Sequence, residues 1–275
     1  MDILITGDAV FTGSELLRNG YVYIRDGRVE ALGEGLPPED ATYASLVIGG
    51  PRRIIAPGIP WPVDPIGYLA KTPECTPEEI PCEARRALGP DEAKASLAAV
   101  LEAHTHGIAI PLLVVSSVST VIHIAEMLGG DYGALIPREC GPAEPHPRIV
   151  AAREYDGGAS VCIARDLCRS ADPYERALEI ARAHGLGDPV IREGEKAVVA
   201  VFDASRPPLL GTRIRSASEA GLIYGAGARA ESLVVGEDIL VEVGEHLMIV
   251  EKHVKEAVRI AGRLWGSEIE GDLSA

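Results

Sequence analysis

Two histidines separated by one residue, His104 and His106, have the spacing in this chain that best suits a metal site. They precede an apolar run from Ile108 that predicts a buried strand. Alternate side chains of an extended chain point the same way, so two imidazoles at this spacing can bind one metal ion. Further candidate ligands by residue type alone are His123, His146, Asp64 and Asp166. The alternative is that both histidines lie at the surface near a helix end, where the dipole favours a cation.

A serine-rich stretch, Ser116-Ser117-Val118-Ser119, lies between the same apolar run and a helical pattern. Backbone N–H groups at such a junction can hold an anion. N-capping of the helix by one of the hydroxyls explains the stretch equally well. The sequence has no Gly-x-Ser-x-Gly nucleophile motif and no glycine-rich phosphate loop.

Five cysteines are present, and no two of them form a Cys-x-x-Cys pair, which disfavours a zinc knuckle: Cys75, Cys82, Cys140, Cys162 and Cys168. We expect free thiols, because an odd number cannot all pair within one chain. Intracellular disulfides of hyperthermophiles are the known exception. The lack of Gln, the single Asn and the 20 Pro favour life at high temperature.

The elements that must position these residues begin and end with β structure. Short strands are predicted at 2–5, 9–11, 21–25, 28–32 and 45–48, as an antiparallel unit. Further strands are predicted at 197–202, 232–235 and 239–243. A last helix over 250–264 carries one apolar stripe.

The middle of the chain alternates helices with strands, which predicts an α/β layer. Residues 60–90 are rich in Pro and Glu and are expected to be irregular. Helices are predicted at 91–103, 120–128 and 174–184. Strands are predicted at 108–115, 133–136, 149–153 and 159–164.

Composition restricts the partners. The 275 residues carry a net charge of -15, from 26 basic and 41 acidic side chains, and no basic run exceeds two residues. This pattern argues against nucleic acid and anionic membranes as partners. No stretch of 18 apolar residues occurs, and the chain opens on a strand pattern, so we expect a cytoplasmic protein.

Two stretches of the sequence resemble the amidohydrolase superfamily, in particular its cytosine deaminase and chlorohydrolase branch. Residues 2–11, 23–33 and 55–58 resemble the opening of those enzymes, which leads from half of a β-sandwich into a (β/α)₈ barrel. Residues 177–187, 194–203 and 232–236 are similar to the return from the barrel to the sandwich. The resemblance implies a metal-dependent hydrolase acting on carbon–nitrogen bonds other than peptides, with a divalent metal such as zinc as cofactor.

The sequence departs from this pattern where the family binds its metal. The family's first barrel strand ends in Asp-x-His-x-His, but here Val63 and Pro65 occupy the places of the two histidines. Neither side chain has a lone pair to offer a metal. The resemblance assigns Asp166 to the family's last barrel carboxylate, which is a ligand and proton shuttle, although Asp166 lies much nearer the following helix than usual. The alternative pairs Asp166 with Arg165 or Arg169 at the surface.

Length also departs from the family, because a (β/α)₈ barrel takes about 250 residues. We therefore predict a mixed α/β protein with a composite β-sandwich from residues 1–58 and 187–249. A truncated, open α/β layer derived from the barrel is expected over 59–186, with a C-terminal helix and tail over 250–275.

Three functions remain open. The first is an amidohydrolase-like enzyme with its usual metal site lost, in which His104 and His106 would bind a metal and Asp166 would move the proton. The second is a catalytically inactive protein, without a metal, that uses the sandwich and the C-terminal helix to form a homo-oligomer or to bind a full-length relative. The third is a small-molecule binding protein that uses the cleft between the two layers.

Overall fold

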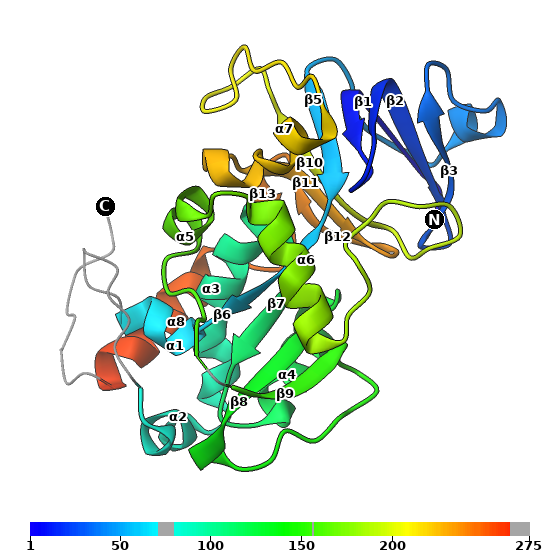
Figure 1. Ribbon diagram of the computed structural model, residues 1–275. Coiled ribbons are helices and arrows are strands. Elements are labelled where there is room, and N and C mark those ends of the chain that lie inside the picture. The colour runs from blue at the N-terminus through cyan, green and yellow to red at the C-terminus, as the bar shows by residue number, and fades with distance from the viewer. Residues whose placement is uncertain (71–79, 156, 265–275) are drawn as a thin grey trace.

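A computed structural model describes residues 1–70, 80–155 and 157–264 of the chain. The described strands form two sheets. One contains the strands from both chain ends, and the other contains the strands of the middle of the chain (Figure 1). The first sheet mixes antiparallel and parallel pairs, whereas the second is wholly parallel. A parallel sheet brings the carboxyl ends of its strands to one edge, where a site can form.

The first sheet opens with five strands. They are β1 (Ile3–Phe11), β2 (Leu16–Arg25), β3 (Arg28–Glu34), β4 (Leu46–Gly49) and β5 (Arg53–Pro57). β1, β2 and β3 pair as an antiparallel meander, as predicted. β4 and β5 instead pair parallel to β1, so the expectation of a wholly antiparallel unit is wrong.

The C-terminal strands complete the same sheet. They are β10 (Val198–Asp203), β11 (Ala230–Val235), β12 (Asp238–Glu242) and β13 (Glu245–His246). β10 pairs antiparallel to β5, which gives the order β13-β12-β11-β10-β5-β1-β2-β3 with β4 beside β1. Strands from the two chain ends are therefore joined directly, although as one hydrogen-bonded sheet instead of two stacked ones.

This composite sheet curls around an apolar core. The amide of Val29 donates to the carbonyl of Glu195, and the amide of Ala197 donates to the carbonyl of Gly27, so the β2–β3 turn contacts the entry to β10. The enclosed side chains alternate along the strands, as a half-buried sheet requires. They include Ile3, Ile5, Val22, Ile24, Ile55, Val199, Val201 and Val234.

The second sheet has four parallel strands and is open. They are β6 (Ile59–Val63), β7 (Ile108–Val114), β8 (Gly133–Pro137) and β9 (Ala151–Tyr155), in that order. The runs of β7 and β8 are apolar on both faces, as strands covered on both sides must be. The prediction of an open α/β layer is consistent with this sheet.

Eight helices of the described chain surround these sheets. They are α1 (Pro65–Ala70), α2 (Cys82–Leu88), α3 (Asp91–Thr105), α4 (Val118–Leu128), α5 (Ile163–Arg169), α6 (Pro173–His184), α7 (Ala217–Gly221) and α8 (Glu251–Leu264). Three short 3₁₀ turns accompany them, η1 (Asp40–Tyr43), η2 (Arg138–Cys140) and η3 (Tyr224–Ala226). α6 begins at Asp172, which caps it, and ends at Gly185 in the left-handed conformation, as predicted. None of the described helices is long and apolar enough to cross a membrane.

The proline-rich region is more regular than its sequence predicts, since β6, α1 and α2 all lie within 59–88. The amide of Asp64 faces away from β7 and donates to the carbonyl of Ser160. Pro60 and Pro62 lie four and two residues before Asp64, so their backbone nitrogens face the same side of β6. Their missing N–H groups therefore lie on the sparsely paired edge of the sheet, where proline is tolerated. The predicted strand over 159–164 is wrong as well: Ser160 forms a single bridge with Val63, and α5 follows.

The expectation of free thiols is wrong for Cys82 and Cys140, which form a disulfide between α2 and η2. Their Cα atoms lie 5.5 Å apart across a sequence separation of 58 residues. Cys162 is disulfide-bonded too, and Cys168 is free and exposed. Sequence spacing could not reveal a pairing that only the folded chain creates.

The apolar stripe of α8 is already used within the chain. α8 packs against α3 and α1, and Ala257 and Ile260 are fully buried there. Lys94 lies 3.4 Å from Glu256, and Arg263 lies 2.8 Å from Asp91, so ion pairs flank the apolar contact. The self-association hypothesis had expected this stripe to contact a second subunit. Its buried residues already pack within the chain and are not available for that contact.

Candidate functional site at the carboxyl edge of the parallel sheet

At the carboxyl end of β6, Asp64 lies between Val63 and Pro65, two residues whose side chains cannot bind a metal. Val63 is fully buried, and Pro65 begins α1. Asp64 between them is 7% exposed, and its Oδ1 accepts hydrogen bonds from the amides of Ile66 and Gly67. These contacts fix the carboxylate at the start of α1, because the first amides of a helix have no partner within it.

Arg85 places a guanidinium at this edge. It comes from α2 and is 2% exposed. Its Nη2 lies 2.6 Å from Asp64 Oδ2, and its Nη1 donates to the carbonyl of Val114 at the end of β7, at 3.0 Å. Its Nε has no hydrogen-bond partner among the residues that the structure describes. The ends of two neighbouring strands are thus joined by a buried ion pair.

This donor set does not fit a zinc ion. Both oxygens of Asp64 are engaged, and a fixed positive charge stands 2.6 Å from one of them. A metal needs several free nitrogen, sulfur or oxygen ligands. Among the residues that the structure describes, no group of three or more His, Cys, Asp and Glu could hold a metal ion.

A second buried acid, Glu92, lies behind the end of β7. Its Oε1 accepts from the amide of Ser116, at 2.9 Å. Its Oε2 accepts from the hydroxyls of Ser116 and Thr120, at 2.7 and 2.8 Å. Burial raises the pKa of Glu92, and these hydrogen bonds and Arg85 counteract the rise. The acid ties the start of α3 to the loop that begins α4.

The other edge of β6 is closed by Ser160. Its amide donates to the carbonyl of Pro62, and its Oγ accepts from Trp61 Nε1 at 2.8 Å. Ser160 thus runs beside β6 in the direction of a parallel strand for one residue. In a closed barrel the last strand would take this place.

A cavity of about 640 Å³ opens at the same end of the sheet. Hydroxyl groups line one side of it, from the residues Ser116, Ser117, Ser119 and Thr120. Arg86 and His123 are the titratable side chains of the lining, and Arg86 donates to the carbonyl of Cys140. In open α/β sheets the carboxyl ends of the strands are where ligands bind. Hydrogen-bond donors of this kind suit a small polar molecule.

The two histidines predicted as a metal pair do not lie in an extended chain, so that expectation is wrong. His104 is in the last turn of α3, and His106 directly follows the helix. Residues two apart at a helix end point to different sides. His106 Nδ1 lies 2.9 Å from the carbonyl of Glu102, whereas His104 Nδ1 lies 2.8 Å from Nε2 of His246.

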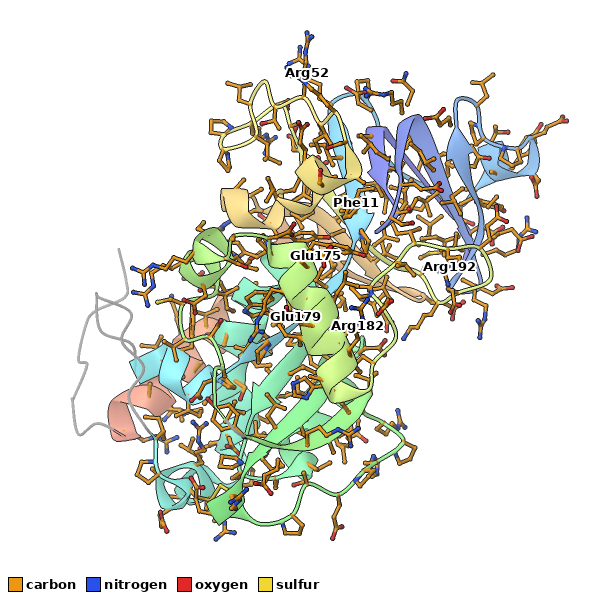
Figure 2. All side chains as sticks on the ribbon, viewed as in Figure 1. Phe11, Arg52, Glu175, Glu179, Arg182 and Arg192 are labelled. Carbon is orange, nitrogen blue, oxygen red and sulfur yellow. A yellow bond between two sulfur atoms is a disulfide. The ribbon has the colours of Figure 1, made fainter. Side chains whose placement is uncertain are left out.

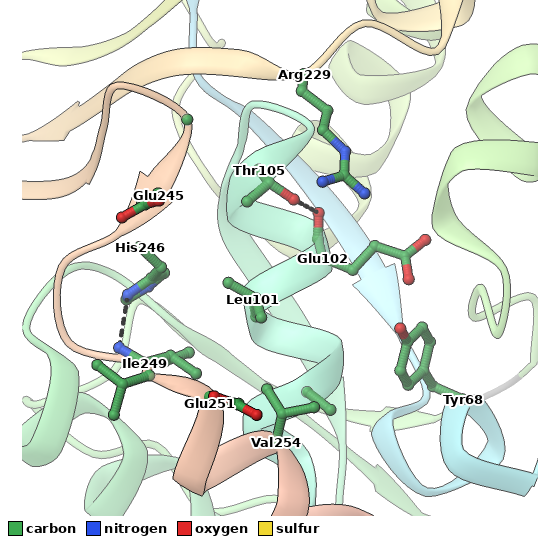
Figure 3. A pocket seen from close by; sticks show the side chains of 13 residues that line it. Tyr68, Leu101, Glu102, Thr105, Arg229, Glu245, His246, Ile249, Glu251 and Val254 are labelled. Carbon is green, nitrogen blue, oxygen red and sulfur yellow. Dashed lines mark hydrogen bonds between the residues drawn. The ribbon is translucent and has the colours of Figure 1, made fainter. Parts of the chain in front are cut away.

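The His104–His246 pair is buried and neutral. His246 Nδ1 accepts hydrogen bonds from the amides of Met248 and Ile249. Figure 3 shows the bond from Ile249 as a dashed line. The proton of His246 is therefore on Nε2 and is donated to His104, which leaves His104 Nε2–H without a partner. Burial lowers the pKa of His246 to about 4, and burial and His246 lower that of His104 further.

A second cavity, of about 480 Å³, lies beside this pair. Figure 3 shows His246 and Ile249 on one side of it, and Glu102 and Tyr68 on the other. Burial and a hydrogen bond to Glu102 raise the pKa of Tyr68. The lining mixes apolar side chains with carboxylates and one arginine, and it provides no group that resembles a catalytic or metal centre.

Asp166, predicted as a proton-shuttling carboxylate, is in the first turn of α5 and partly exposed. The Nε of Arg165 lies 3.8 Å from its Oδ1, which is the surface pairing considered as its alternative. Asp166 follows Ser160, the strand-like residue beside β6, by six positions. The structure therefore does not assemble His104, His106 and Asp166 into one metal-binding group.

Comparison with known proteins places the fold. No protein-family model matches the chain, and no curated protein does. A zinc-bound adenosine deaminase from Xanthomonas campestris matches with a TM-score of 0.69 at 12% identity, over 96% of this chain and 99% of that one. A zinc-complexed atrazine chlorohydrolase from Arthrobacter aurescens TC1 matches with 0.67 at 15%, over 94% and 100%. A guanine deaminase from E. coli matches with 0.60 at 9%, over 88% and 99%.

These structures are members of the amidohydrolase superfamily, so the chain has the fold that its sequence resemblance implied. Identity this low shows a common fold and does not carry the activity. Sequence analysis missed Arg85 and Glu92. Arg85 lies in the region expected to be irregular, and Glu92 has the position of an ordinary first-turn acid, so neither gave a signal of its own.

Proposed function

We propose that this chain, on the fold of the zinc-bound amidohydrolases, binds a small polar molecule at the carboxyl edge of its parallel sheet and does not hydrolyse it through a metal. The observation that carries the proposal is the Asp64–Arg85 ion pair between the buried ends of β6 and β7. A guanidinium there occupies the place and the charge that a metal would need.

The cavity at the same edge of the sheet supports a binding role. It is about 640 Å³, within the usual range of small-molecule sites, and hydroxyls, Arg86 and His123 line it. Glu92 does not act as a free base there, because both of its oxygens already accept hydrogen bonds from Ser116 and Thr120. With Ser116 and Thr120 engaged by Glu92, the hydroxyls of Ser117 and Ser119 and the side chains of Arg86 and His123 are the groups of the lining that can recognise a ligand.

The test combines turnover with retention of a ligand. Turnover of adenosine, guanine and atrazine is assayed with and without added zinc. These compounds are chosen because the enzymes of similar fold are named for acting on them. Small molecules released from the purified, denatured protein are identified by mass spectrometry. We expect no turnover of these compounds. We also expect a molecule to be released from the wild type and from Ser218→Trp, the exposed control. It should be absent from Ser119→Trp, in which the tryptophan fills the cavity mouth.

Zinc-dependent turnover of any of the three compounds would overturn the proposal and favour the hydrolase hypothesis. A molecule released equally from both tryptophan variants would show that the cavity is not its site. Either result is obtained on folded protein, because Ser119 and Ser218 are both exposed.

Self-association is a second candidate function. Large apolar side chains are exposed around β13 and the start of α8, at Val243, Leu247, Met248 and Val250. A homo-oligomer that covers them would be disrupted by Leu247→Lys with Met248→Lys. Light scattering after size-exclusion chromatography checks this, and a monomeric wild-type protein would refute it.

A further inference from the structure

A third cavity, of about 500 Å³, lies on the composite sheet. It is formed where β1, β2 and β5 meet the loop that follows β10, and its lining includes Asp8, Arg18, Arg52, Thr212 and Arg213. Figure 2 shows Arg52 at the outer end of this sheet, beside that loop. The cavity belongs to a different sheet from the carboxyl-edge site.

The charge of this cavity is opposite to that of the protein. The chain as a whole carries -15, but three arginines and one aspartate line this space. Among the described residues, neither Arg52 nor Arg213 has a partner for its side chain. The guanidinium of Arg18 donates to the carbonyl of Arg215, and its backbone amide donates to Glu34 Oε1. Most of the other described arginines have an acidic or carbonyl partner, as Arg25, Arg53 and Arg85 do. Three arginines whose guanidiniums have no carboxylate partner among the described residues therefore line one cavity, together with the carboxylate of Asp8.

The backbone at Arg52 is unfavourable for an arginine. Its φ is 60°, in the left-handed region, directly after Pro51 and before β5. A proline followed by a positive φ is the pattern of a type II turn, whose third residue is normally glycine. A side chain at this position costs about 1 kcal/mol compared with glycine. The turn itself does not require arginine at this position.

We propose that this cavity binds the phosphate groups of a small molecule that carries two or more adjacent phosphates. A guanidinium donates two parallel hydrogen bonds to phosphate oxygens and stays charged at every physiological pH. Several guanidiniums around one cavity suit a ligand with several negative charges. A ligand with a single carboxylate would engage only one of the guanidiniums. Long nucleic acids are disfavoured, because the chain as a whole carries a net charge of -15.

Isothermal titration of the full chain with pyrophosphate and with ATP, without added metal, tests the proposal. We expect both to bind, and the double variant Arg52→Ala with Arg213→Ala to bind at least tenfold more weakly. Affinity should also fall as salt rises, because the guanidiniums are exposed. The control is Arg148→Ala with Arg169→Ala, which removes two exposed arginines elsewhere and should bind as the wild type does.

Arg52→Gly separates binding from folding. Glycine suits the left-handed backbone, so this variant should keep or raise the melting temperature while it weakens pyrophosphate binding. Equal affinity for pyrophosphate and ATP identifies the phosphates as the recognised group, and a much higher affinity for ATP shows that the ligand is a nucleotide. Absence of binding to both probes, or an equal loss in the control variant, would overturn the proposal.

Discussion

The carboxyl edge of the parallel sheet and the arginine cavity of the composite sheet use the same kind of side chain in opposite ways. At the edge, Arg85 is buried and its charge is matched by Asp64, with Glu92 satisfied nearby. In the cavity, Arg52 and Arg213 are exposed and have no described partner. Charges that satisfy one another hold a fold together, whereas charges left free are available to a ligand.

The strongest way to break this comparison is to remove Arg85. Arg85→Met leaves Asp64 as a buried carboxylate without its cation, so the free energy of unfolding should fall by about 3–5 kcal/mol. Arg52→Ala, which removes an exposed and unpaired arginine, should change it by less than about 0.5 kcal/mol. Urea denaturation measures both.

The double variant Asp64→Asn with Arg85→Met serves as the control for this prediction. It leaves no unpaired charge, so it should recover part of the stability that Arg85→Met loses. A loss below about 1 kcal/mol in Arg85→Met alone would show that the pair does not hold the edge together.

The disulfide between Cys82 and Cys140 anchors the helix that carries Arg85. Replacing both cysteines by serine opens a loop of 58 residues and should lower the free energy of unfolding by about 2–4 kcal/mol. Cys168→Ser, at the free and exposed thiol, should have no effect on denaturation. Equal stability of the double variant and the wild type would contradict the assignment of the bond.

The buried histidine pair predicts a loss of stability in acid. The folded pKa of His246 is about 4, below its unfolded value of 6.5, so the unfolded state binds the proton first as pH falls. Stability should be complete above pH 6.5 and should fall by about 3 kcal/mol towards pH 4. His246→Gln should flatten this dependence, whereas His123→Gln, at an exposed position, should not.

Glu92 predicts a dependence on pH of opposite sign. Its folded pKa is raised above the usual 4.5, so the folded state holds the proton longer than the unfolded state does. The stability of the wild type relative to Glu92→Gln should therefore decrease as pH rises above 4.5, by about 1.4 kcal/mol for each unit of pKa elevation. Denaturation at a series of pH values checks this. A constant difference between the two proteins would show that Glu92 is ionised as readily as in the unfolded chain.

The sequence predicted the elements well where one periodicity was clear. The strands 108–115 and 133–136 and the helices 91–103 and 174–184 differ from the structure by a few residues at their ends. His104 was assigned to an extended segment because the end of α3 was placed too early. Gly107, at a φ of 79°, lies just beyond the helix and was the available signal for its end.

The polar cluster at the sheet edge could not be predicted, for physical reasons. Asp64 and Arg85 are 21 residues apart, and the segment between them has no periodicity that would place them together. Glu92 and Ser116 meet only because α3 packs beside β7. The resemblance placed Val63 and Pro65 where the family has two histidines, but nothing in the sequence indicated that the guanidinium of Arg85 would lie against Asp64.

The zinc content of the purified protein, measured by elemental mass spectrometry after incubation with excess zinc and removal of unbound metal, tests the central claim most directly. The Asp64–Arg85 pair predicts zinc far below one ion per chain, and the same value for His104→Ala with His106→Ala. One zinc per chain, lost in that double variant, would contradict the account and establish a metal centre at the two histidines.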